Sequence, residues 1–77
     1  MMSMQATVLQ VQEGQLLVFN QAMSQKVVVH TADAGRFRIG DSVCIRYSGI
    51  MAMSIPPQIT AINISKMSGF GYGNRLC

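Results

Sequence analysis

The stretch from Phe37 to Ile64 constrains the fold of this chain more than any other part of the sequence. Gly40-Asp41 is typical of a tight turn, and the residues after it alternate between apolar and more polar types, as on a strand with one buried face. A second run of this kind follows Pro56-Pro57. Since proline cannot donate a hydrogen bond to a sheet, we expect the second strand to begin after Pro57. The apolar residues of the first run are Val43, Ile45 and Tyr47.

The rest of the chain also favours strands over helices. Residues 27–29 are three consecutive valines, whose branched side chains lose rotamer freedom in a helix and fit a pleated sheet. Glu13-Gly14 predicts a hairpin turn. Residues 15–20 are almost continuously apolar, which suggests burial on both faces or a contact between copies. The expected strands span residues 4–12, 15–20, 26–30, 42–48 and 58–65.

Five short strands separated by turns predict an all-β fold, a small five-stranded barrel. A three-strand meander, a crossing segment and two more strands is the layout of the OB fold. Residues 31–35 are expected to form at most one helical turn, capped by Thr31 and ended by Gly35, so the helix between the third and fourth strands is absent or reduced to that turn. One domain is expected over residues 1–66, followed by a flexible glycine and aromatic tail over 67–77.

Residues 37–64 resemble a pattern found in small OB-like β-barrel domains of unknown function from Gram-positive bacteria, many of them in lipoproteins or secreted proteins. The resemblance implies a fold and implies no activity. It is carried by Phe37, Gly40-Asp41, Val43, Ile45, Tyr47, Gly49, Pro57-Gln58, Ala61 and Ile64.

The composition indicates apolar surface that a partner would cover. Of the 77 residues, 49% are hydrophobic and only 12% are charged, so a barrel this small cannot bury every apolar side chain. The segment 50–55 is too apolar for an ordinary surface loop. It either plugs the end of the barrel or contacts a partner, and self-association through it and through apolar strand edges is the main functional hypothesis. The residues concerned are Ile50, Met51, Met53 and Ile55.

The alternative hypothesis is single-stranded nucleic-acid binding on a face of the barrel. OB barrels bind single strands through a basic groove and aromatic side chains on which bases stack. A net charge of +3 permits such binding without demanding it. The competing interpretation is that Phe19 and Phe37 are core residues and that the cations only keep the barrel in solution. The candidate contacts are Lys26, Arg36, Arg38, Arg46 and Tyr47.

Catalysis, metal binding and cofactor binding are not expected. The chain has three carboxylates, one histidine and two cysteines, and none of them has the close spacing of a zinc site or of an acid–base pair. Cys44 and Cys77 do not make a disulfide framework, and the N-terminal residues do not read as a signal peptide. The sequence therefore predicts a cytoplasmic protein with reduced thiols and no membrane segment.

Overall fold

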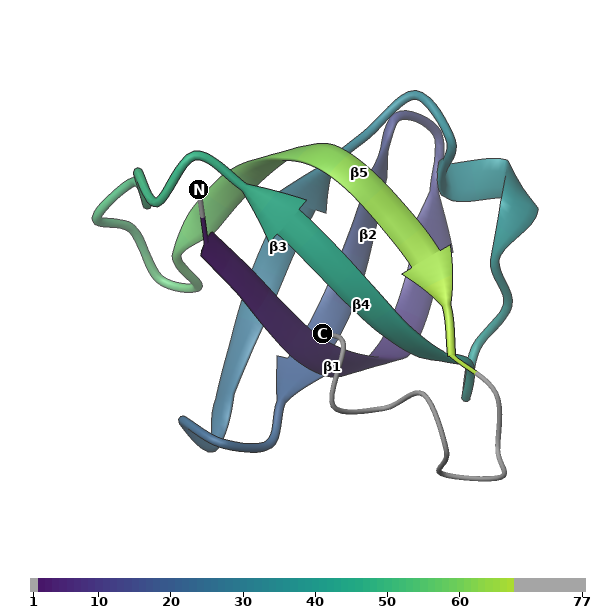
Figure 1. Cartoon of the computed structure of the whole chain (residues 1–77), viewed down its shortest axis with the longest axis horizontal. Coiled ribbons are helices and arrows are strands. Elements are labelled where there is room, and N and C mark those ends of the chain that lie inside the picture. The colour runs from purple at the N-terminus through teal and green to yellow at the C-terminus, as the bar shows by residue number, and fades with distance from the viewer. Residues whose placement is uncertain (1, 68–77) are drawn as a thin grey trace.

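The computed structural model describes residues 2–67, and in it five strands form a closed barrel (Figure 1). A single 3-10 turn, η1 (Ala34–Arg36), lies between the third and fourth strands. This confirms the predicted class, a small all-β barrel whose helix is reduced to one turn. The first strand begins at Met2 rather than at Met4 as predicted. The strands are β1 (Met2–Gln12), β2 (Gln15–Asn20), β3 (Gln25–His30), β4 (Ser42–Tyr47) and β5 (Gln58–Lys66).

The strand order around the barrel is β1-β2-β3-β5-β4, and β4 returns to pair with β1. Four of the neighbouring pairs are antiparallel, and β3 with β5 is the parallel one. That parallel pairing is short, because it joins only Val28, Val29 and His30 to the first residues of β5. The residues Gln25–Val27 of β3 consequently pair with β2 alone.

The core follows from the alternation of side chains along each strand. Successive residues of a strand point to opposite faces, so every second residue enters the barrel. Burying such a side chain contributes about 1.5–3 kcal/mol, which makes this apolar interior the main source of stability. The largest side chains with almost no exposed surface are Val8, Leu16, Val18, Val27, Val29, Val43 and Ile45.

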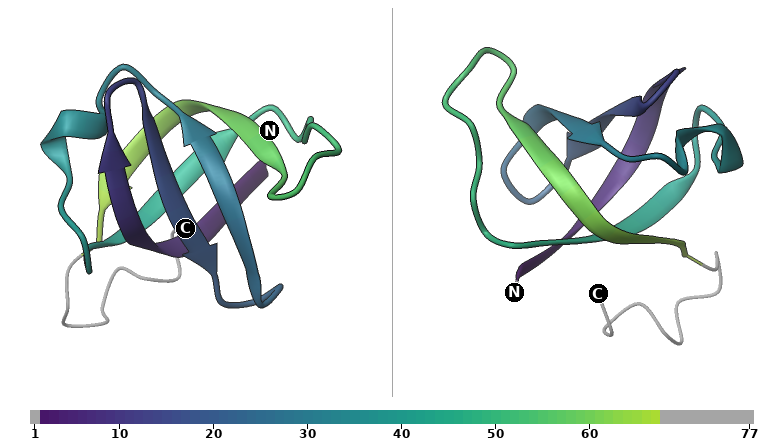
Figure 2. Two further views of the ribbon diagram at one scale, coloured as in Figure 1. Left: turned by 180° about the vertical axis from the view of Figure 1, so that it is seen from behind. Right: turned by 90° about the horizontal axis from the view of Figure 1, so that it is seen from above.

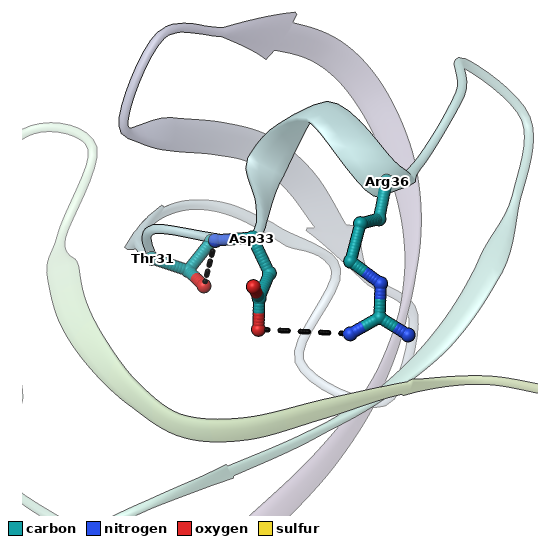
Figure 3. A network of polar contacts seen from close by, with 3 residues as sticks. All are labelled: Thr31, Asp33 and Arg36. Carbon is teal, nitrogen blue, oxygen red and sulfur yellow. Dashed lines mark hydrogen bonds and ion pairs between the residues drawn. The ribbon is translucent and has the colours of Figure 1, made fainter.

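The connection between β3 and β4 differs in detail from the expected helical turn. The hydroxyl of Thr31 accepts a hydrogen bond from the N–H of Asp33 at 3.1 Å, so Asp33 rather than Thr31 precedes the turn (Figure 3). The turn then runs through Gly35 to Arg36 instead of ending at Gly35. Local bonds of this kind offer the backbone an alternative to a longer helical turn.

The C-terminal tail lies almost entirely outside the described residues. Only Met67 of the predicted segment 67–77 is described, and its N–H donates to the carbonyl of Ser42 at 2.8 Å. Within residues 2–67 the one helical element is the short turn η1, which is far too short to cross a membrane.

Candidate partner-binding site

The β4–β5 loop, residues 48–57, presents three large apolar side chains to solvent. Ile50 is 79% exposed, and Met53 and Ile55 are fully exposed. Single exposed apolar side chains are common on protein surfaces. Several of them together on one short loop are unusual, because burial of apolar surface is the main driving force of folding. The loop projects from one end of the barrel in both views of Figure 2.

Hydrogen bonds hold this loop in shape. The N–H of Ala52 donates to the carbonyl of Gln58 at 2.8 Å, and the N–H of Gln58 donates back at 3.3 Å. Within the tip, the hydroxyl of Ser54 donates to the carbonyl of Pro56 at 2.7 Å. The tip is therefore closed at its base, and a partner that binds it has less disorder to remove.

One of the four predicted loop residues packs against the barrel, and the other three are exposed to solvent. Met51 is half-buried and packs against the core, as the plug interpretation expects. Ile50, Met53 and Ile55 do not cover the barrel end. Most of the apolar surface of the loop is thus available to a partner.

Apolar side chains lie on the outer surface of β2 and β3. On β2 and β3 the residues that point outward include Leu17, Phe19 and Val28, and all three are half-buried. Leu17 lies opposite Val28, and Phe19 lies opposite Lys26. On β4 the outward residues are instead Ser42, Cys44 and Arg46. We call Leu17, Phe19 and Val28 the apolar outer face; the apolar run in residues 15–20 was its signal in the sequence.

A hollow of about 520 Å³ lies between the tip of the loop and the part of β2 and β3 that includes Leu17 of the apolar outer face. It is large enough for one or two side chains of a partner. Lys26 is the one charged residue among those that line it. The lining residues are Leu17, Ser24, Gln25, Lys26, Ser54, Ile55, Pro56 and Pro57.

The five residues predicted for nucleic-acid binding do not gather on one face. Lys26 lies on β3, Arg46 on β4, and those two strands are not neighbours in the barrel. Arg36 lies on the β3–β4 connection, where its guanidinium is 3.7 Å from the carboxylate of Asp33 (Figure 3). Both partners of this pair are largely exposed, so the pair contributes little to stability.

The other two residues of that set also stand apart. Arg38 is exposed on the β3–β4 connection beyond the 3-10 turn. Tyr47 is 6% exposed and belongs to the core, so its ring does not offer a stacking surface. This corrects the prediction for Tyr47. Phe19, half-buried on the apolar outer face, is the better-placed aromatic ring.

The remaining reactive side chains are scattered. His30 Nε2 is 2.7 Å from Gln58 Oε1, which links the outer sides of β3 and β5. Cys44 is disulfide-bonded, contrary to the predicted reduced thiol. Among the described residues there is no group of three potential metal ligands drawn from histidine, cysteine, aspartate and glutamate.

No family model matches the chain, and neither the curated proteins nor the solved structures contain a significant match to it. The resemblance of residues 37–64 to OB-like domains therefore stays a prediction, and the site has to be interpreted from its own geometry.

Proposed function

We propose that this protein is a small assembly module that associates with a second copy of itself through the tip of the β4–β5 loop. The observation that supports the proposal is the exposure of Ile50, Met53 and Ile55 on a loop whose base is fixed by backbone hydrogen bonds. The strand order, with β3 parallel to β5, supports assignment of the barrel to the OB type.

Strand edges contribute less to this proposal than the loop does, because the barrel is closed. Each of the five strands has a neighbour on both sides over at least part of its length, and closure removes the continuous edges through which sheets associate. The proposal therefore rests on the loop and on the adjoining apolar outer face.

The energies are compatible with a weak dimer. Burial of one exposed Ile or Met side chain is worth about 1.5–3 kcal/mol, so three on each of two copies give about 9–18 kcal/mol. Association costs about 4–15 kcal/mol in lost freedom of motion. A surplus of about 4–8 kcal/mol lies inside the difference between these two ranges, and it corresponds to a dissociation constant between about 1 mM and 1 μM.

Sedimentation equilibrium over that concentration range tests the proposal. Replacing Ile50 and Met53 by serine should shift the chain toward monomer, because both side chains are exposed and neither supports the core. Ile39→Ser is the matched control, since Ile39 is 71% exposed on a different connection. A wild-type chain that stays monomeric at the highest concentration refutes the proposal.

Single-stranded nucleic-acid binding is the second candidate, and one observation favours it. Phe19 and Lys26 lie opposite each other on β2 and β3, the strands whose outer face binds ligands in OB barrels. With Lys26 as the one cation on this face, a plot of the logarithm of the binding constant against the logarithm of the salt concentration would have a slope of about −0.7. The slope would be about −3 if four cations contacted phosphates.

Fluorescence anisotropy with a short labelled oligonucleotide at low salt distinguishes these cases. Phe19→Ala and Lys26→Ala should each weaken binding, whereas Arg46→Ala, on β4, should not. Equal effects of all three substitutions, or no binding, would remove this candidate.

The cytoplasmic location is also a proposal. Disulfides persist mainly in oxidising compartments, so the bonding state of Cys44 in cells distinguishes a cytoplasmic from an oxidising location. Alkylation of intact cells before lysis gives the answer: Cys44 is labelled if the protein is cytoplasmic, and it stays protected if the compartment is oxidising.

A further inference from the structure

The first half of β3 has one open side. Val28 donates its N–H to the carbonyl of Pro57 at 2.9 Å, toward the side of β5. Alternate residues of a strand direct their backbone groups the same way, so the N–H and C=O of Lys26 point to this side as well. There β5 has not yet begun, and Lys26 is paired only with β2. Figures 1 and 2 show β3 continuing past the start of β5.

The hollow described above adjoins this open side. Gln25 and Lys26 of β3 line it together with Pro56 and Pro57 of the β4–β5 loop. A proline has no N–H, so the loop cannot complete the ladder beside Lys26 by itself. Leu17 and Ile55 add apolar surface to the same hollow.

We infer that the open side of β3 binds an extended segment of a partner protein, which adds to the barrel as a short extra strand. The backbone of that segment bonds to Lys26, and one of its apolar side chains fills the hollow. An acidic side chain of the segment lies near the Lys26 ammonium, because no carboxylate lines this site. This second binding mode goes beyond the proposed self-association, with which it shares the apolar residues Leu17 and Ile55.

A second copy of the chain does not fit the site in the same way. Two such open sides related by a two-fold axis would pair Lys26 with Lys26, and like charges directly opposite each other are destabilising. A register shifted by two residues would pair Lys26 with Ser24. Ser24 has a φ of +50°, which is not a strand conformation. The site therefore favours a partner of different sequence.

Selection from a displayed library of random heptapeptides on the immobilised full chain tests the inference. We expect enrichment of peptides that alternate β-branched or aromatic residues with an Asp or Glu at one fixed position. The best peptide is then synthesised with each backbone amide N-methylated in turn. Methylation should weaken binding about tenfold or more at alternate amides and have little effect at those between them.

Charge reversal supplies the test on the protein side. Lys26→Glu should lower the affinity for the acidic peptide about tenfold and raise the affinity for a peptide in which Lys replaces the acidic residue. Arg46→Glu, on β4, should change neither affinity much. Lys26 is exposed, and circular dichroism verifies that the variant folds. The peptide should still bind the Ile50→Ser, Met53→Ser variant, which separates this site from the self-association surface.

Three results of the peptide experiments overturn the inference. They are the absence of an enriched pattern, an equal response to methylation at every amide, and the same effect from Lys26→Glu as from Arg46→Glu. Mixed wild-type and Lys26→Glu chains that form a heterodimer through β3 would overturn it in favour of a second copy.

Discussion

Replacing Asn20 by alanine should destabilise the barrel through the turn between β2 and β3. Asn20 is 7% exposed and is the one buried polar residue in the core of the described chain. Its side-chain oxygen accepts hydrogen bonds from the N–H groups of Ala22 at 3.1 Å and Met23 at 3.3 Å. Its amide nitrogen also donates to the sulfur of Met4 at 3.7 Å. One side chain thus links the turn to the interior.

The magnitude follows from these bonds. Each bond to the turn is worth about 0.5–1.5 kcal/mol, and the small cavity left by alanine adds to the loss, so we expect a total of about 2 kcal/mol. A domain of this length has a free energy of unfolding of about 4–12 kcal/mol, so the change is a large fraction of it. The melting temperature should fall by about 8–16 °C.

Urea denaturation followed by circular dichroism measures the loss, with Asn63→Ala as the control because Asn63 is exposed on β5. Amide hydrogen exchange gives a second readout: the amides of Ala22 and Met23 should exchange faster in Asn20→Ala. A loss below about 0.5 kcal/mol, or unchanged exchange at these two amides, would refute the reasoning.

Three further substitutions test the backbone and the core by urea denaturation. Gly49 has a φ of +99°, and a Cβ there would lie 3.1 Å from Met2 Sδ, so Gly49→Ala should lower the free energy of unfolding by about 1–2 kcal/mol. Gly35→Ala is the control, and its free energy of unfolding should be within about 0.5 kcal/mol of wild type. Ser24→Gly relieves a φ of +50° and should stabilise by about 0.5–1 kcal/mol, and a loss would contradict this. Ile45→Ala should cost about 2–5 kcal/mol, and a smaller loss would mean that the core collapses around the cavity.

The strands were predictable because their signals are local. Branched residues in 27–29 and the alternation in 42–48 each act over a few neighbouring positions, and the observed strands differ from the predicted ones only at their ends. The same alternation also predicts that Tyr47 is buried. It shares a face with Val43 and Ile45, so the pattern already placed it in the core rather than on a binding surface.

The site was harder to predict because it depends on contacts between distant parts of the chain. The residues of the β4–β5 loop fit a plug and an interface equally well until the bonds between Ala52 and Gln58 fix the direction of the tip. The open side of β3 depends on where β5 begins to pair with it, at Val28. No pattern within 25–30 contains that information.

The most direct test of the central claim is a dilution series followed by NMR of the isoleucine and methionine methyl groups. The account predicts that the signals of Ile50, Met53 and Ile55 shift or broaden with concentration, because these side chains enter the interface. Ile39, exposed on the β3–β4 connection, should stay constant. Signals of the three loop residues that do not change between about 10 μM and 1 mM would contradict the account.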